Sequence, residues 1–199
     1  MLQLTKNIPF EAGIAVFPDQ HGVDSLIVGI KATFSLKGKV DIAAEQSPLI
    51  YADEYWAEPG QSSLKLASEM HLPKPATDIV LLGHAQAPNR RSVHQLNVTL
   101  MAGNVKKIVR IFGDRQWVSS RPTAPISFET MPLVYEKAFG GLHQIDDEVF
   151  FEPRNPVGKG FAGKRKNKEL EKLPLPNIED PRHLLSRPGD IPAPAGFGY

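Results

Sequence analysis

The sequence predicts a mainly β fold: an antiparallel sheet sandwich or open barrel with few short helices and an irregular, Gly- and Pro-rich C-terminal arm. Apolar and polar residues alternate along several segments, which is the period of a strand with one buried face. Gly, Pro and Asn separate these segments as turns. After residue 151, Gly, Pro and charged residues dominate. We therefore expect an antiparallel β domain over residues 1–151 and a wrapping arm over residues 152–199.

The first predicted hairpin lies between residues 12 and 36. The segment 18–22 (PDQHG) supplies its turn residues. The apolar residues of the second strand alternate with partly polar neighbours: Leu26, Val28, Ile30, Ala32, Phe34 and Leu36. This alternation predicts a long strand with one buried face.

The clearest hairpin of the chain spans residues 94–117 and folds about residues 102–104 (Ala-Gly-Asn). On its first arm Leu96, Val98 and Leu100 point to one side, while Asn97 and Thr99 point to the other. That pattern fits one face on a core and one face in solvent, so the sheet is expected to be antiparallel.

Helix is expected to be a minor component, with short candidates around residues 133–139 and 167–173. The C-terminal arm contains too few apolar residues to fold alone, but enough to anchor it on the β domain. These anchors are Phe161, Leu175, Ile178, Leu184, Leu185 and Phe197.

Composition excludes several classes of protein. Of 199 residues, 41% are apolar and 8% aromatic, as in ordinary globular proteins. Lys and Arg number 23 against 22 Asp and Glu, so no global field would attract nucleic acid. The chain has no Cys, no recognisable signal peptide and no apolar run approaching the roughly 20 residues of a membrane helix. We expect a cytoplasmic protein that neither binds nucleic acid nor inserts into a membrane.

Two motifs are rich in Gly and Pro and restrict the backbone path more than the packing of a core requires. They are MPLVYEKAFGG (residues 131–141) and RNPVGKGF (residues 154–161). Their glycines allow positive φ or close approach of two backbones, and their prolines fix φ. Such loops either carry function or are simply turns.

The sequence contains no recognisable catalytic or ligand-binding motif. The six His residues form no HxH or HExxH pair. The segment 156–160 (PVGKG) lacks the Ser or Thr that a phosphate-binding loop places after its Lys. We therefore expect no catalytic residue, no cofactor and no metal.

Charged and aromatic side chains surround the two motifs. We expect some to tie the loops together through turns and charge-assisted hydrogen bonds, including Asp114 with Arg115, and Glu136 with Lys137 or Arg154. The expected scaffold residues are Asp114, Arg115, Glu136, Lys137, Gly140, Gly141, Pro156, Gly158 and Gly160. Aromatic and Arg residues contribute most to interface energies, so others are expected to bind a protein partner. These are Trp117, Tyr135, Phe139, Arg154 and Asn155.

Six strings occur in a characteristic order: SSLKLASEMHLPKPATDIVLLGHAQAP, KKIVRIFGDRQW, MPLVYEKAFGG, RNPVGKGF, LPNIEDP and PAGFG. Together they resemble a domain-of-unknown-function family of Gram-negative bacteria, whose genes lie beside type VI secretion effectors and PAAR-like spike proteins. The resemblance implies a non-enzymatic adaptor or chaperone that binds a PAAR-like toxin effector and helps load it onto the secretion spike. The spike itself is a further candidate partner.

Two alternatives stay open. A hydrolase or carbohydrate-active enzyme would use Glu136 or Asp114 as acid or base. The motifs would otherwise be purely structural. Members of the family usually continue past the PAGFG string into another β-rich segment, so we expect the chain, which ends at Tyr199, to be a fragment or a short form.

Overall fold

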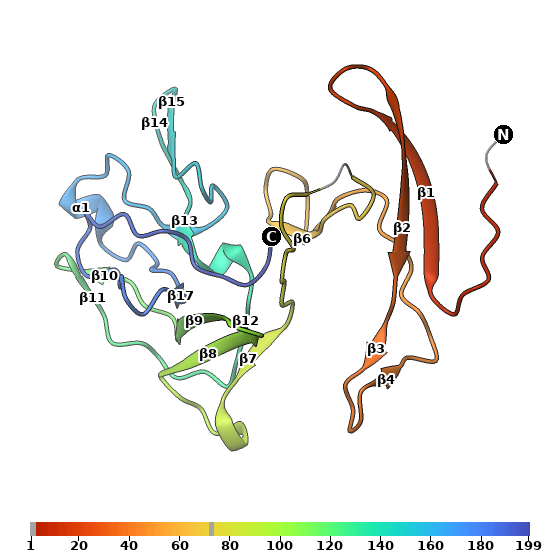
Figure 1. The fold of residues 1–199 in the computed structure, drawn as a ribbon. Helices are drawn as coiled ribbons and strands as arrows, with labels where there is room; N and C mark the ends of the chain where they lie inside the picture. The colour runs from red at the N-terminus through yellow and green to blue at the C-terminus, as the bar shows by residue number, and fades with distance from the viewer. Residues whose placement is uncertain (1–2, 72–73) are drawn as a thin grey trace. The chain divides into compact units, whose positions relative to one another are not determined.

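The computed structural model describes residues 3–71 and 74–199 and confirms a mainly β chain with antiparallel pairing and little helix (Figure 1). The strands are β1 (Glu11–Pro18), β2 (Asp24–Lys31), β3 (Phe34–Ser35), β4 (Asp41–Ile42), β5 (Glu54–Tyr55), β6 (Leu64–Leu66), β7 (His84–Gln86), β8 (Gln95–Ala102), β9 (Val105–Phe112), β10 (Trp117–Val118), β11 (Arg121–Pro122), β12 (Thr130–Pro132), β13 (Phe139–Gly140), β14 (Leu142–Ile145), β15 (Glu148–Phe151), β16 (Lys159–Gly160) and β17 (Ile178–Glu179). They form small two- and three-stranded sheets.

Among residues 3–71 and 74–199, helix is confined to short segments, as the sequence predicts. The α-helix α1 spans Asn167–Leu170, within the predicted candidate at 167–173. Single 3₁₀ turns, η1 and η2, occur at Pro88–Arg90 and Tyr135–Lys137, the second inside the candidate at 133–139.

The described chain divides into two compact units. The first comprises Met1–Glu54 and Leu64–Asp78, and the second comprises Tyr55–Ser63 and Ile79–Tyr199. By this grouping residues 152–199 are one part of the second unit. The predicted boundary after residue 151 stays a prediction.

The hairpin of β1 and β2 forms most of the regular structure of the first unit. Its turn is closed by the Asp19 carboxylate, which accepts hydrogen bonds from the backbone N–H of His21 (2.7 Å) and Val23 (3.0 Å). On one face, Gly13 and Gly29 leave the space that the side chains of Tyr51 and Met70 fill. That face is packed.

The opposite face of the same hairpin is not covered by the described residues of the first unit. Leu26, Val28 and Ile30 share it, and they are 54%, 56% and 63% exposed. Val16, which pairs with Leu26 across the ladder, is also exposed. We call these four side chains the hairpin face. The sequence correctly predicts that Leu26, Val28 and Ile30 share a face, but the predicted strand is too long, because β2 ends at Lys31, before Ala32, Phe34 and Leu36. The predicted burial is also wrong, because no described residue of the first unit covers this face.

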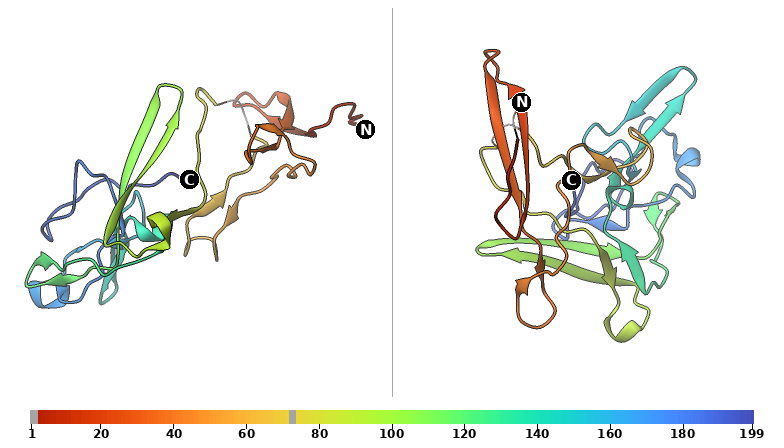
Figure 2. Two further views of the ribbon diagram at one scale, coloured as in Figure 1. Left: turned by 90° about the horizontal axis from the view of Figure 1, so that it is seen from below. Right: turned by 90° about the vertical axis from the view of Figure 1, so that its right-hand side faces the viewer.

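The second unit is built around the antiparallel sheet β8–β9–β17, in which β8 and β9 form a long twisted ribbon (Figure 2). The predicted hairpin about residues 102–104 is confirmed, with Ala102 opposite Val105. Val109 and Ile111 of β9 are fully buried. They pack with Ala85 of β7, Met131 of β12 and Ile178 of β17. Side chains outside the strands complete this core: Phe128, Leu133, Ala138, Ala195 and Phe197.

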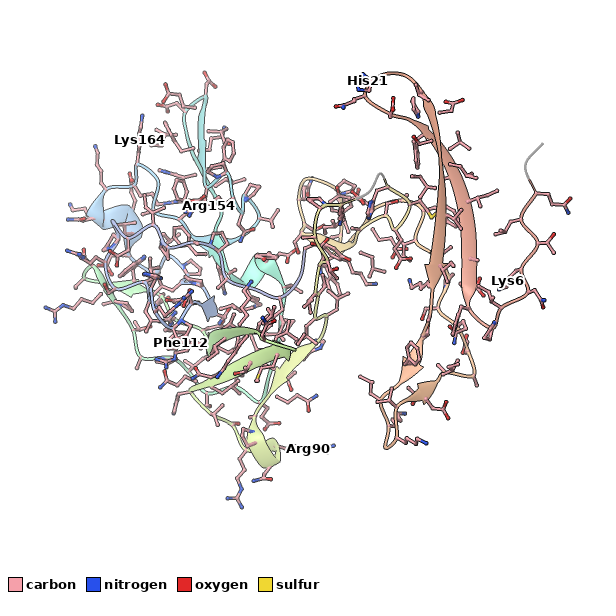
Figure 3. All side chains as sticks on the ribbon, viewed as in Figure 1. Lys6, His21, Arg90, Phe112, Arg154 and Lys164 are labelled. Carbon is pink, nitrogen blue, oxygen red and sulfur yellow. The ribbon has the colours of Figure 1, made fainter. Side chains whose placement is uncertain are left out.

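The C-terminal arm is irregular over most of its length and packs onto the rest of the second unit. Leu175 and Leu185 join Trp117 and Phe139 in a second apolar cluster. The side chains crowd together in the second unit and are sparse along β1 and β2 (Figure 3).

Candidate functional site

The two sequence motifs lie side by side. The first carries η2 and β13, the second carries β16, and the two strands form a parallel ladder that pairs Gly140 with Gly160. Lys159 N–H donates to the Ala138 carbonyl (3.0 Å), and Phe161 N–H donates to the Gly140 carbonyl (2.9 Å). Segments about 20 residues apart in sequence therefore form one loop junction.

Asn155 holds this loop junction from inside. Its Nδ2 group donates to the carbonyl oxygens of Tyr135 (2.8 Å) and Phe139 (3.0 Å), and its own carbonyl accepts from Gly141 N–H (2.9 Å). The side chain is buried. Asn155 thus satisfies backbone groups that burial would otherwise leave unpaired.

The glycines are required by the close approach of the two segments. A Cβ atom at Gly140, where φ is 152°, would collide with the Asn155 carbonyl. At Gly158 it would collide with the Asn155 amide, and at Gly160 it would lie 2.6 Å from Cδ of Pro176. Among the remaining scaffold residues, Gly141 also has positive φ, and Pro156 lies in the turn that Gly158 N–H closes onto the Asn155 carbonyl (3.3 Å).

Glu136 forms hydrogen bonds with a different segment, at Ser63. Its two carboxylate oxygens accept hydrogen bonds from the backbone N–H (2.7 Å) and the hydroxyl (2.8 Å) of Ser63. The predicted pairing of Glu136 with Lys137 or Arg154 is replaced by this contact. Sequence reasoning missed Ser63 because 73 residues separate the two side chains.

The sequence suggested that Arg115 pairs with Asp114, but this prediction is wrong. Arg115 pairs with Glu179 of β17. The pair is buried, and Arg115 also donates to the Pro176 carbonyl (2.8 Å). Its guanidinium lies 3.8 Å from the centroid of the Phe112 ring. Burial raises the pKa of Glu179, although the charge of Arg115 acts in the opposite direction. The ion pair joins the end of β9 to the C-terminal arm.

Asp114, Lys137 and Lys159 line an open pocket of about 580 Å³. A hydrogen bond from Asn177 (3.0 Å) lowers the pKa of Asp114, so this carboxylate is ionised at neutral pH. Lys159 Nζ lies 3.8 Å from Asp114. Burial, followed by the charge of Lys137, lowers the pKa of Lys159.

The residues expected to bind a partner fall into two groups. Trp117, Phe139 and Asn155 are buried, so their side chains offer no surface to a partner in this conformation. Tyr135 is half-buried against the sheet core, and the side chain of Arg154 is 47% exposed while it donates to Glu152 (2.6 and 3.0 Å). Partner binding by these last two stays a prediction.

The described residues contain neither a candidate metal site nor a membrane-spanning helix. Within residues 3–71 and 74–199, no group of three or more His, Asp or Glu side chains is placed to hold a metal ion. No helix in this part of the chain has the length and apolar character needed to span a membrane.

The fold and these contacts define a mainly β protein with a hydrogen-bonded loop junction and an exposed apolar hairpin face. The chain belongs to a family described as an uncharacterized protein conserved in bacteria (DUF2169), whose sequence profile matches residues 21–199. No curated protein and no solved structure gives a match to it. The resemblance to a family of this kind is thereby confirmed, whereas the gene neighbourhood stays a prediction.

Proposed function

We propose that the protein is a cytoplasmic, non-enzymatic adaptor or chaperone that binds a PAAR-like toxin effector and helps load it onto the type VI secretion spike. The resemblance of the sequence motifs suggests the partner. The hairpin face is the observation that supports a binding role, because an uncovered apolar surface of this kind marks interaction sites in other proteins.

The energetics favour a covered hairpin face. Full burial of one Leu, Val or Ile side chain contributes about 1.5–3 kcal/mol. A two-stranded sheet is only marginally stable by itself. In the described part of the chain, β1 and β2 pair only with each other, so each has one outer edge. A partner that covers the face or adds a strand to an edge would stabilise the hairpin, and the same contacts would contribute to the binding affinity.

The acidic residues considered for a hydrolase have other roles in this structure. Both oxygens of Glu136 are occupied by Ser63, and Asp114 accepts from Asn177 with a lowered pKa. A carboxyl group with a lowered pKa is a poor proton donor at neutral pH. These contacts favour the adaptor over the enzyme.

The test is co-purification with PAAR-like proteins encoded beside the gene. The wild type should bind, and Val28→Lys with Ile30→Lys should weaken binding at least tenfold, because two charges would have to be buried in the interface. The matched control is Leu142→Lys with Val149→Lys, which places two lysines on the hairpin β14–β15, where these residues are 58% and 55% exposed.

Circular dichroism checks that each variant keeps its fold. Full binding by the folded Val28 and Ile30 variant would exclude the hairpin face as the docking site. Failure of the wild type to bind any PAAR-like neighbour would overturn the proposed function.

A further inference from the structure

One edge of β9 is open over half its length. Along its other edge, β9 pairs with β8 through the whole strand, from Gln95 opposite Phe112 to Ala102 opposite Val105. On the open side β17 covers two residues, with Ile178 opposite Ile111 and Glu179 opposite Arg110. The third strand of this sheet therefore stops early.

The sequence explains why β17 stops. Continued in the same register, the next hydrogen-bonding position opposite Ile108 would be Pro181, which has no N–H to donate. The chain instead turns away: His183 N–H donates to the Asp180 carbonyl (3.0 Å), and Arg182 N–H donates to the Asp180 side chain (2.9 Å). This is a β-turn with Pro at its second position.

The exposed stretch of β9 presents unused hydrogen-bonding groups. Phe112 N–H donates to the Asn177 carbonyl (2.7 Å), which shows that the peptide groups of Phe112 point toward the β17 side. Since these directions alternate along a strand, the peptide groups of Ile108 and Lys106 point the same way. Over the described residues, no hydrogen bond reaches them from that side.

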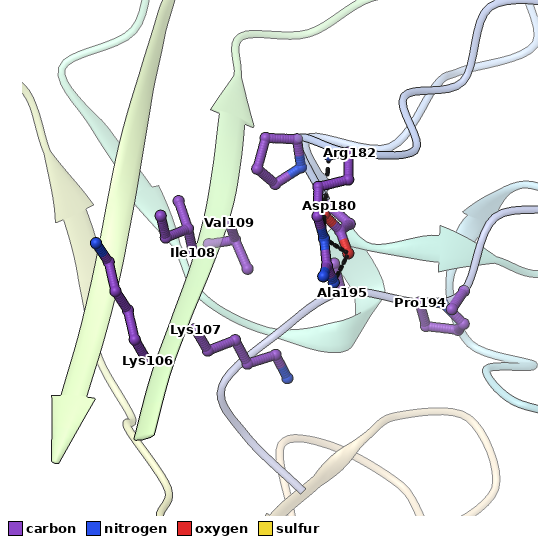
Figure 4. A pocket seen from close by; sticks show the side chains of 10 residues that line it. Lys106, Lys107, Ile108, Val109, Asp180, Arg182, Pro194 and Ala195 are labelled. Atoms are coloured by element: carbon purple, nitrogen blue, oxygen red, sulfur yellow. Dashed lines mark hydrogen bonds and ion pairs between the residues drawn. The ribbon is translucent and has the colours of Figure 1, made fainter. Parts of the chain in front are cut away.

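A pocket of about 380 Å³ occupies the place where the strand would continue. It is bounded by β9 from Lys106 to Val109, by the turn at 180–182, and by the segment 193–195 (Figure 4). An extended segment of a few residues fits a space of this kind.

The pocket is basic. Lys106 and Lys107 take part in none of the ion pairs within the described part of the chain. Asp180, the one carboxylate among the described lining residues, is neutralised by Arg182 at 2.7 Å. Side chains alternate between the faces of a strand, so the two lysines offer a positive charge on each face of β9.

We propose that the open edge of β9 binds an acidic, extended segment of a polypeptide partner as an added strand. The backbone of the segment pairs with Ile108 and Lys106, and its carboxylates meet Lys106 and Lys107. Backbone pairing supplies affinity, and the lysines select acidic sequences. This site is distinct from the hairpin face and does not require the partner to be a PAAR-like protein.

The test uses defined peptides and the full chain. Fluorescein-labelled, acetylated Glu-Val-Glu-Glu-Val is titrated and followed by anisotropy, beside Lys-Val-Lys-Lys-Val and a form of the acidic peptide that is N-methylated at its central residue. We expect the acidic peptide to bind at least tenfold more tightly than either, and to slow amide hydrogen exchange at Ile108. Equal binding of the three peptides, no binding of any, or unchanged exchange at Ile108 would overturn the proposal.

Charge reversal locates the site. Lys106→Glu with Lys107→Glu should weaken binding of the acidic peptide at least tenfold. Lys37→Glu with Lys39→Glu makes the same change of net charge at exposed positions of the first unit and should leave binding within twofold. Equal losses in the two variants would show a net-charge effect and reject the β9 edge, whatever the outcome with PAAR-like proteins.

Discussion

At the scale of single residues, the loop junction depends on Asn155, a side chain that the sequence assigns to partner binding. Replacement by Ala would remove two donors and leave the buried carbonyl of Phe139 without this partner. We expect Asn155→Ala to lower the free energy of unfolding by about 2 kcal/mol or more. Urea unfolding followed by tryptophan fluorescence measures this.

The exposed Asn167 at the start of α1 provides the control, since Asn167→Ala should change stability by less than about 0.5 kcal/mol. A similarly small effect of Asn155→Ala would show that the loop junction is held by its backbone bonds alone.

The pairing of Asp180 with Arg182 predicts how the stability of the fold depends on pH. Hydrogen bonds from Arg182 lower the pKa of Asp180 from 3.8 to about 2 in the folded protein. Because the folded pKa lies below the unfolded one, this group stabilises the fold above about pH 4, and the contribution is lost as pH falls toward 2. The effect is small, because the Arg182 side chain is 79% exposed and solvent screens the pair.

Urea midpoints of the wild type and of Asp180→Asn, measured from pH 6 to pH 2.5, should converge as pH falls. A constant difference between them would show that the turn is stabilised by the shape of the side chain and not by its charge.

At the scale of elements, the sequence predicts best where one strand and its turn are contiguous. Leu96, Val98 and Leu100 and the turn at 102–104 specify β8 and β9 because alternation and turn chemistry are local. The pairing of Arg115 with Glu179 spans 64 residues and follows only from the folded path of the arm. Likewise, alternation identifies Leu26, Val28 and Ile30 as one face but carries no information on what covers it.

The Arg115–Glu179 pair yields a prediction at this scale, because it links the end of β9 to β17. Arg115→Met or Glu179→Leu alone leaves an uncompensated buried charge and should cost about 3–5 kcal/mol. The double variant removes both charges and should lose much less stability than the sum of the two single losses. Thermal unfolding of the four proteins forms the cycle, and additive losses would contradict a direct coupling between the two side chains.

At the scale of the whole molecule, the two units differ in how much apolar surface they bury. Among the buried apolar side chains of the described residues, Met70 lies in the first unit and all the others lie in the second. The first unit also exposes the hairpin face. A unit with so small a core is expected to be the less stable of the two, and to gain stability from whatever covers that face.

Because the units have separate cores, we expect unfolding in urea to deviate from two-state behaviour. Both tryptophans, Trp56 and Trp117, belong to the second unit, so tryptophan fluorescence reports that unit, whereas far-ultraviolet circular dichroism reports strands of both. The circular dichroism signal should begin to fall at lower urea than the fluorescence. A partner bound to the hairpin face at 100 times its Kd would add about 2.7 kcal/mol to the first unit and move the early transition upward. Transitions that coincide with both probes would instead mean that the two units unfold as one cooperative body.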